Sequence, residues 1–202
     1  MMLISDPSWA VQADLPRLHD LLLDLLCDRA YREGDFLLSS GQRSTYYING
    51  KQVTLHPQGS VAVGRLLAAR LPQEITAVAG LTLGADPIVT AVSVVAAYAG
   101  RDLTPLIVRK EAKGHGTQAY IEGPELPAGT AIAVLEDVVT TGGSALKAVT
   151  RLRDAGYVVD RVLALVDRQQ GGAELYAQEG LIFDALYRIP DLQQRYRALA
   201  AD

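Results

Sequence analysis

The residues best suited to chemistry lie in one stretch, where two adjacent carboxylates, Glu136 and Asp137, precede a run of hydroxyls and glycines that extends to Ser144. Glycines let the backbone turn tightly and bring its N–H groups onto an anion, and a helix N-terminus adds a partial positive charge. The hydroxyls of Thr140, Thr141 and Ser144 can donate further hydrogen bonds to phosphate oxygens. The run therefore predicts a phosphate-binding loop.

The two carboxylates need a different partner, because like charges repel the phosphate. They can accept hydrogen bonds from a diol or help to hold a divalent cation. A phosphate and a diol together indicate a ribose 5-phosphate. The alternative is an acidic strand end followed by a capped helix, which the position of the carboxylates directly after a predicted buried strand disfavours.

The segment Val134–Ser144 resembles the phosphoribosyl-pyrophosphate motif of the type I phosphoribosyltransferases. Its wording, Glu-Asp-Val-Val-Thr-Thr-Gly-Gly-Ser, is similar to that of the orotate phosphoribosyltransferase family in particular, and the resemblance runs from about Tyr31 to Tyr187. The resemblance implies a catalytic role for Asp137. It also implies that phosphoribosyl pyrophosphate contacts Glu136, Asp137, Val138, Val139, Thr140, Thr141, Gly142, Gly143 and Ser144.

A second motif concentrates positive charge. Arg109, Lys110, Lys113 and His115 lie within seven residues, and the following glycines favour a mobile segment that closes over a polyanion. A solvated surface loop is the alternative. Resemblance to the family's flexible catalytic loop, here residues 109–123, implies catalytic contacts of Lys113 and His115 with pyrophosphate. Arg109 and Lys110 would support them, and the loop would serve the active site of a partner subunit.

Arg168 closely follows the predicted strand Val162–Val166. An arginine fork at the carboxyl end of a strand suits bidentate capture of a planar carboxylate, although a structural Asp–Arg pair is the alternative. The resemblance implies that Arg168 binds orotate, a pyrimidine with one carboxylate. It further implies that Thr140 touches the base and that Tyr47 and Ile48 cover it from an N-terminal hood. Packing within the hairpin is the alternative for the paired tyrosines, Tyr46 and Tyr47.

Two positions differ from some relatives, which have a lysine where this chain has Ser39 and Tyr-Lys where it has Leu83-Gly84. The second difference falls in the turn Gly80–Pro87, whose small residues suit an anion-binding nest. Without that lysine, magnesium and the loop cations must neutralise more of the pyrophosphate charge.

The elements that must position these residues alternate along the chain. Continuous apolar runs indicate strands covered on both faces, and strands alternating with helices imply a parallel sheet with right-handed crossovers. Ligands of such sheets bind beyond the carboxyl ends of the strands. The expected strands are 36–41, 46–50, 77–80, 103–109, 130–135, 162–166 and 181–187, and the expected helices are one from Asp14 and those at 57–71, 87–98, 144–155 and 173–179.

We expect one α/β domain, residues 1–202, with the type I phosphoribosyltransferase fold: a central, mostly parallel sheet flanked by helices, with a small N-terminal hood. The N-terminal helix and hood are expected at about 14–56, and the core at about 57–190. In residues 1–13 the apolar residues follow no clear periodic spacing, and this segment is expected to form a loose arm.

Composition narrows the class of protein. The 202 residues are 49% hydrophobic and 21% charged, which excludes disorder as the main state. A net charge of −4 disfavours binding to nucleic acid. The start lacks the basic residues of a signal peptide, and the apolar stretch 88–100 is too short to span a membrane. The single cysteine, Cys27, can form no internal disulfide, so we expect a cytoplasmic protein.

Together, the motifs and the resemblance imply a transferase that joins orotate to phosphoribosyl pyrophosphate, giving orotidine 5′-phosphate and pyrophosphate in de novo pyrimidine biosynthesis. The resemblance also implies Mg²⁺ as cofactor, with no residue assigned directly to the metal, and a homodimer with shared active sites. The alternatives are a phosphoribosyltransferase for a purine base and a non-catalytic regulator that senses phosphoribosyl pyrophosphate.

Overall fold

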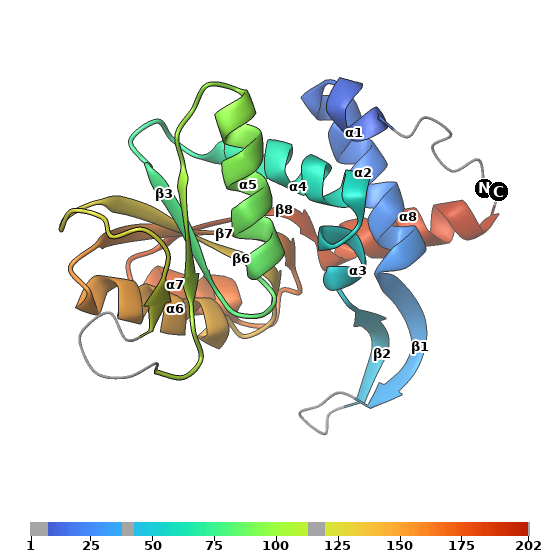
Figure 1. The fold of residues 1–202 in the computed structure, drawn as a ribbon. Helices are drawn as coiled ribbons and strands as arrows, with labels where there is room; N and C mark the ends of the chain where they lie inside the picture. Colours follow the sequence, from blue (N-terminus) through green and yellow to red (C-terminus); the bar gives the residue numbers. More distant parts are fainter. Residues whose placement is uncertain (1–7, 38–42, 113–119, 202) are drawn as a thin grey trace.

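The computed structural model describes residues 8–37, 43–112 and 120–201. Its centre is a six-stranded sheet in the order β5-β4-β3-β6-β7-β8, in which every neighbouring pair is parallel except β4 and β5 (Figure 1). The strands are β3 (Ala77–Leu81), β4 (Thr104–Val108), β5 (Ile121–Glu122), β6 (Ala131–Val139), β7 (Val158–Asp167) and β8 (Ile182–Arg188). The predicted α/β class with a mostly parallel sheet is confirmed.

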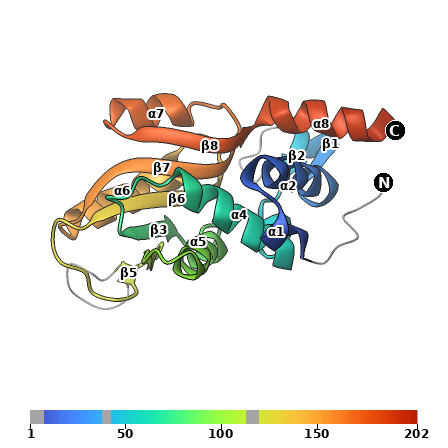
Figure 2. The same cartoon turned by 90° about the horizontal axis from the view of Figure 1, so that it is seen from above.

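Helices cover both faces of this sheet (Figures 1 and 2). One face is covered by α4 (Pro57–Arg70) and α5 (Asp86–Tyr98), and the other by α6 (Gly143–Asp154) and α7 (Gly172–Gln178). Successive side chains of a strand point to opposite faces, so Leu135 belongs to one hydrophobic core and Val134 to the other. This two-sided burial explains why the strands are continuous apolar runs.

The N-terminal part of the chain adds a smaller layer beside the sheet. It consists of α1 (Trp9–Gln12), α2 (Leu15–Arg29), the antiparallel hairpin of β1 (Tyr31–Leu37) and β2 (Arg43–Ile48), and α3 (Lys51–Thr54). The C-terminal helix α8 (Ile189–Ala201) packs against α2, and the hairpin extends away from the sheet (Figure 1). Among the described helices, none combines the length and the hydrophobicity that crossing a membrane requires.

The expectation of a loose arm is wrong for the described residues before α2. Trp9 and Ala10 are buried in the core. Arg65 Nη1 of α4 donates hydrogen bonds to the carbonyl oxygens of Ala10 at 2.7 Å, Val11 at 3.0 Å and Ala13 at 2.8 Å. A helix of four residues shows no period that a sequence pattern could reveal, and its partner is an arginine more than 50 residues away.

Several predicted boundaries are also wrong. The strand predicted to end at Leu135 continues to Val139, because β7 pairs with it along its whole carboxyl end. The first hairpin strand begins at Tyr31 rather than at residue 36, and the second occupies 43–48 rather than 46–50. Two residues of the predicted 109–123 loop form β5, and the helices α1, α3 and α8 were not predicted.

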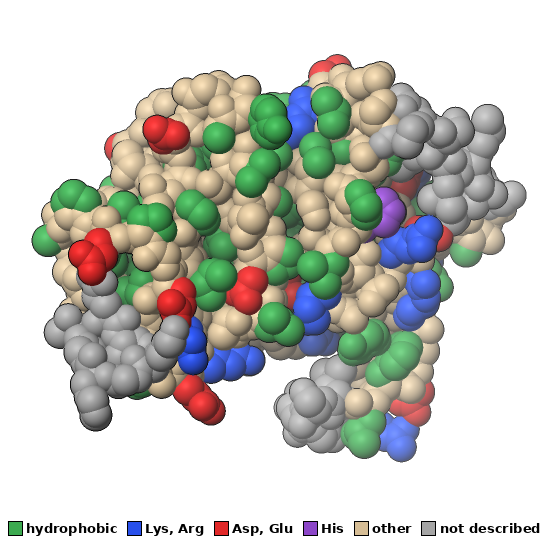
Figure 3. Space-filling model, viewed as in Figure 1, with side chains coloured by type: hydrophobic (Ala, Val, Ile, Leu, Met, Phe, Trp, Pro, Cys, Tyr) green, Lys and Arg blue, Asp and Glu red, His purple; other side chains and the backbone are tan. Residues whose placement is uncertain are grey.

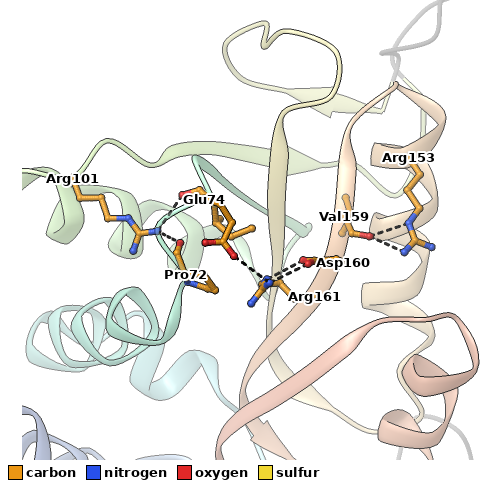
Figure 4. Close-up of polar contacts among 8 residues, drawn as sticks. Pro72, Glu74, Arg101, Arg153, Val159, Asp160 and Arg161 are labelled. Carbon is orange, nitrogen blue, oxygen red and sulfur yellow. Dashed lines mark hydrogen bonds and ion pairs between the residues drawn. The ribbon is translucent and has the colours of Figure 1, made fainter.

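Arginines hold the edge of the sheet opposite to the carboxyl ends of the strands (Figure 4). Arg101 donates to the carbonyl oxygen of Pro72 at 2.5 Å, just before β3 begins. Arg161 of β7 lies 3.9 Å from a carboxylate oxygen of Glu74, and Arg153 of α6 donates to a carbonyl near the start of β7 at 2.7 Å. These contacts fix the amino ends of the strands and thereby the positions of their carboxyl ends.

The sheet has a switch point between β3 and β6, because the chain leaves these two neighbours in opposite directions along the sheet. Ligands of such sheets bind in the crevice at this point. Gly80 permits close packing here. A Cβ at this position would lie 2.2 Å from Ala85 Cβ, at the start of α5, and 2.7 Å from the carbonyl oxygen of Leu135 in β6.

We therefore expect Gly80→Ala to destabilise the protein by about 1–3 kcal/mol, since overpacking a dense core forces the backbone to shift. Gly143→Ala is the control, because a Cβ there would have no heavy atom within 4 Å. Urea unfolding followed by circular dichroism measures both. Equal stability of the two variants would contradict the tight packing at Gly80.

Candidate active site

The carboxyl ends of three neighbouring strands bring the predicted motifs to one edge of the sheet. β6 lies between β3 and β7, and the last residues of β6 and β7, Val139 and Asp167, are paired. The backbone N–H of Arg168 donates to the carbonyl oxygen of Val139 at 2.9 Å. The predicted phosphate loop after β6 and the predicted orotate-binding arginine after β7 therefore lie side by side.

The loop from β6 to α6 has the geometry expected of an anion cradle. It surrounds a cavity of about 80 Å³ lined by Glu136, residues 138–145 and Tyr176. Gly142 adopts a φ of 85°, a conformation that side-chain-bearing residues rarely adopt, and its carbonyl oxygen accepts a hydrogen bond from Tyr176 Oη at 3.2 Å. No side chain of the described residues caps the first turn of α6, so its N–H groups can bind an anion.

Asp137 is enclosed by backbone from two other segments. A Cβ at Gly84 would lie 2.7 Å from Asp137 Oδ1, and a Cβ at Gly50 would lie 3.2 Å from Asp137 Cβ. Asp137 Oδ1 accepts the N–H of Val138 at 2.8 Å, and Lys51 Nζ lies 3.9 Å from Oδ2. Glycine at position 84, where some relatives have a lysine, thus leaves room for the Asp137 carboxylate. Lys51, the first residue of α3, was not predicted, since a lone lysine carries no signal in the sequence.

Glu136 differs in environment from its neighbour. It is 6% exposed, its Oε1 accepts the N–H of Asp137 at 3.2 Å, and its Oε2 has no hydrogen-bond partner among the described residues. Burial, with the adjacent Asp137 charge as a second cause, raises the pKa of Glu136 to about 8. This environment therefore favours the neutral form of the Glu136 carboxyl in the free protein.

Arg168 contacts the hairpin through Tyr46, a residue to which the sequence assigned no role. Its Nε donates to Tyr46 Oη at 3.1 Å, and its guanidinium carbon lies 4.9 Å from the centre of the Tyr46 ring. Tyr47, the next residue of β2, is 44% exposed and lies against Phe36, with ring centres 5.7 Å apart. Ile48 is partly buried against the core. Because side chains alternate along a strand, Tyr46 and Tyr47 face opposite sides of the hairpin.

The base of the predicted catalytic loop is held by α6. Arg151 donates to the carbonyl oxygens of Arg109 and, at 2.9 Å, of Lys110, and its guanidinium lies 3.9 Å above the Tyr120 ring. Arg109 pairs with Glu122 at 3.0 Å, and its backbone N–H donates to Tyr120 at 2.7 Å. Both ends of the loop are thus fixed to the helix that follows the cradle.

Three predicted positions, Lys113, His115 and Ser39, lie outside the described residues. Within the described ranges, no group of three or more His, Cys, Asp and Glu side chains could hold a metal ion. Glu136 lines the cradle and Asp137 adjoins it, and the described part of the chain provides no complete metal cage made of protein ligands alone.

A larger cavity of about 620 Å³ lies apart from the cradle, between α3, α4 and α5. Its lining is mostly apolar and includes the exposed side chains of Leu55, Leu83 and Val94. Figure 3 shows exposed hydrophobic side chains over this region. Lys51 lines this groove and also contacts Asp137, so the groove borders the candidate site.

The chain is similar to orotate phosphoribosyltransferases in both sequence and structure. The chain is 69% identical to the orotate phosphoribosyltransferase of Nostoc sp. over 191 residues, which cover 95% of this chain and 93% of that protein. A solved orotate phosphoribosyltransferase of Mycobacterium tuberculosis in complex with Fe(III) dicitrate is 39% identical, with a TM-score of 0.76 over 87% of this chain and 98% of that one. The same enzyme in complex with phosphoribosyl pyrophosphate is 35% identical, with a TM-score of 0.72 over 87% and 99%. No family model matches the chain.

The Glu136 environment predicts how stability changes with pH. Its folded-state pKa is raised above the ordinary value of 4.5, so this residue's stabilisation is fully present below about pH 4.5 and is lost as the pH rises through about 8. We expect the Glu136→Gln variant to keep this part of its stability as the pH rises. Between pH 5 and pH 8, its free energy of unfolding should therefore increase by on the order of 2 kcal/mol relative to that of wild type.

Denaturant unfolding at several pH values measures this difference, and Glu179→Gln, at an exposed carboxylate, is the control. Parallel pH profiles for wild type and Glu136→Gln would show that Glu136 is ionised in the folded protein throughout this range.

Proposed function

The chain belongs to the orotate phosphoribosyltransferase family, and from this premise we propose how its residues divide the work of the reaction. The protein transfers the 5-phosphoribosyl group from phosphoribosyl pyrophosphate to orotate, giving orotidine 5′-phosphate and pyrophosphate in pyrimidine biosynthesis. Its fold is that of the type I phosphoribosyltransferases. The observation that carries our proposal is the junction of the anion cradle and Arg168 at the ends of β6 and β7.

The cradle supplies the site for the 5-phosphate. The N–H groups at the start of α6 and the hydroxyls of Thr140, Thr141 and Ser144 donate to its oxygens. Glycines at 142 and 143 let the backbone approach, and residues 138 and 139 form the adjoining wall. Because this site binds the phosphate at one end of the donor substrate, it orients the ribose toward the carboxylates that precede it.

Glu136 and Asp137 act on the ribose. Asp137 accepts hydrogen bonds from the ribose hydroxyls, while a protonated Glu136 can donate one as well as accept. The reacting ribosyl carbon loses pyrophosphate and gains orotate N1, whose own proton is lost, and it passes through a state with oxocarbenium character. The negative charge of Asp137 stabilises that developing cation, which is the catalytic role we assign to it.

The orotate site adjoins the cradle. Arg168 binds the orotate carboxylate, and Thr140 contacts the base from the cradle side. Ile48, on the same side of the hairpin as Tyr46, bounds the base, whereas the side chain of Tyr47, which the resemblance also implies as a contact, faces the opposite side. The support for this proposal is the position of Arg168 beside Val139 and its hydrogen bond to the hairpin. Binding in this pocket places orotate N1 near the ribose, so that positioning supplies much of the rate enhancement.

The leaving group is assigned to the cationic loop. We assign Lys113 and His115 to direct contact with pyrophosphate, and Arg109 and Lys110 to support at the base of the loop. A partly buried cation beside the departing oxygens stabilises the charge that develops there. His115 can also donate a proton to the leaving group, since a histidine titrates near neutral pH.

Magnesium is proposed as the cofactor. Mg²⁺ typically binds one or two carboxylates together with substrate phosphates and keeps several waters, so a protein cage is not required. The chain fits this mode of binding: Asp137 would supply an oxygen, and Glu136 would supply another in its ionised form, since Glu136 Oε2 is a buried atom without a partner among the described residues. When bound, the ion would neutralise part of the pyrophosphate charge. This matters for this chain because Gly84 stands where some relatives have a lysine.

The two alternatives lose support. Membership in the orotate phosphoribosyltransferase family favours orotate over a purine base, which has no carboxylate for Arg168. The same membership favours an enzyme over a non-catalytic sensor of phosphoribosyl pyrophosphate. The net charge of −4 supports the further proposal that nucleic acid is not a partner.

A homodimer with shared active sites is proposed as the functional assembly. Its support is the resemblance of the 109–123 loop to one that serves a partner subunit, together with the apolar groove of α3, α4 and α5. Three large hydrophobic side chains there are about half or more exposed: Leu55 at 67%, Leu83 at 65% and Val94 at 49%. Exposed apolar surface next to an active site is typical of an interface between subunits.

A cytoplasmic location is proposed on the state of the single cysteine. Cys27 is buried, and its thiol donates weakly to the carbonyl oxygen of Leu192 at 3.5 Å. Burial raises the pKa of Cys27 to about 12, which keeps the thiol unreactive. A chain with no internal disulfide suits a reducing compartment.

The first test is the absorbance of orotate after addition of phosphoribosyl pyrophosphate and Mg²⁺. We expect rapid loss of orotate with release of pyrophosphate, and no turnover after EDTA removes the metal. Uracil, the same ring without the carboxylate, is the control substrate and should not be consumed. Binding of phosphoribosyl pyrophosphate without loss of orotate would leave the cradle assignment standing and overturn that of Arg168.

Shared active sites predict complementation between two inactive variants. Lys113→Ala should lower kcat by on the order of 10²–10³, as for other charge-stabilising donors, and Arg168→Ala should abolish orotate binding. Refolding the two variants together should restore roughly a quarter of wild-type activity, because half of the dimers then contain one intact site. Each variant refolded alone is the control, and no recovery in the mixture would refute sharing.

A further inference from the structure

Tyr46 and Arg168 join two parts of the molecule that the reaction must bring together. Tyr46 belongs to β2 of the hairpin and Arg168 follows β7 of the main sheet, 122 residues later. The 3.1 Å hydrogen bond from Arg168 Nε to Tyr46 Oη is accompanied by a distance of 4.9 Å between the guanidinium carbon and the ring centre. The tyrosine therefore holds the guanidinium by its hydroxyl and also contacts it with its ring.

The tyrosine is itself fixed in place. Tyr46 is 9% exposed and stacks on Tyr31, with ring centres 5.8 Å apart and an interplanar angle of 28°. Tyr31 is fully buried, and Tyr196 of α8 packs its ring edge against it at 5.2 Å. Three elements thus fix the ring whose hydroxyl accepts from Arg168, so the hydroxyl is a rigid reference point for the guanidinium.

The backbone of Arg168 is fixed as well. Its N–H donates to Val139 at 2.9 Å, and the next residue, Gln169, adopts a φ of 54° while donating its N–H to Asp167 Oδ1 at 2.8 Å. With the backbone fixed at one end and Nε at the other, the terminal amino groups have little freedom. One of them, Nη2, is buried and has no hydrogen-bond partner among the described residues.

A buried guanidinium donor without a partner is costly unless a ligand satisfies it. A guanidinium offers a carboxylate two bidentate edges, one formed by Nε and a terminal nitrogen and the other by the two terminal nitrogens. Because Tyr46 occupies Nε, the edge that remains is the terminal one. The open edge of the guanidinium and the unpaired Nη2 both favour binding of a planar anion.

We propose that Tyr46 is a positioning residue that holds Arg168 so that its two terminal nitrogens receive the carboxylate of the pyrimidine substrate. Tyr46 thereby contributes to the discrimination between a pyrimidine with a carboxylate and one without. This inference rests on the proposed function of Arg168 and adds to it the group that orients the guanidinium.

The test is Tyr46→Phe, which keeps the ring, its stacking on Tyr31 and its contact with the guanidinium, and removes the hydroxyl. We expect KM for orotate to rise about tenfold, because a hydrogen bond to a charged group is lost, while kcat and KM for phosphoribosyl pyrophosphate stay within twofold of wild type. Inhibition by uracil should not change, so the ratio of orotate to uracil affinity should fall.

Tyr187→Phe is the matched control. Tyr187 is also buried, and its hydroxyl donates to a carbonyl oxygen at 2.7 Å, but in α2 and not at the site. We expect its kinetic constants to match wild type even if its melting temperature falls. A second variant, Arg168→Lys, should raise KM for orotate, and adding Tyr46→Phe to it should produce no further increase.

Three results would overturn the proposal. If Tyr46→Phe leaves KM for orotate unchanged while Arg168→Lys raises it, Arg168 binds the carboxylate without help from Tyr46. If Tyr46→Phe raises KM for both substrates, weakens uracil equally and lowers the melting temperature, the residue has a structural role alone. If Arg168→Lys also leaves KM for orotate unchanged, the proposed function of Arg168 fails, and the role of Tyr46 fails with it.

Discussion

The position of β6 between β3 and β7 is the constraint on which the rest of the site depends. Its parallel pairing with β7 continues to the last residue of each strand and is extended by the hydrogen bond from Arg168 N–H to Val139. Because β3 and β7 flank the same strand, the turn at Gly84, the carboxylates of β6 and Arg168 meet at one edge. Loss of this register would separate the proposed phosphate, ribose and base subsites at once.

The same strand creates the unequal pair of carboxylates. Glu136 lies in the buried part of β6, where desolvation favours its neutral form, whereas Asp137 faces Lys51 at 3.9 Å. Two adjacent acidic residues thus lie in unlike environments, one of which favours the neutral form. This division suits a site that must bind a phosphorylated sugar without repelling it and yet stabilise a developing cation.

The hairpin and α6 hold the segments that border the candidate site. The hairpin is anchored through the stacked Tyr31 and Tyr46, and α6 holds the base of the cationic loop through Arg151. The hood and the loop are therefore each tied to the core by an aromatic residue and an arginine, in the pairs Tyr46–Arg168 and Tyr120–Arg151. Such contacts fix the parts that surround the substrates without occupying the space the substrates need.

The local features of this protein could be predicted from its sequence, because they depend on residues that are neighbours in the chain. The apolar runs of the buried strands, the capped start of α2 at Asp14 and the glycine turn at Gly142 are of this kind. Tertiary structure alone decided the burial of Glu136 and the contact of Tyr46 with Arg168. The first depends on how deeply β6 lies in the sheet, and the second joins residues 122 positions apart. Neither a protonation state nor a pairing over such a distance leaves a pattern in a single sequence, because both depend on which surfaces the fold brings together.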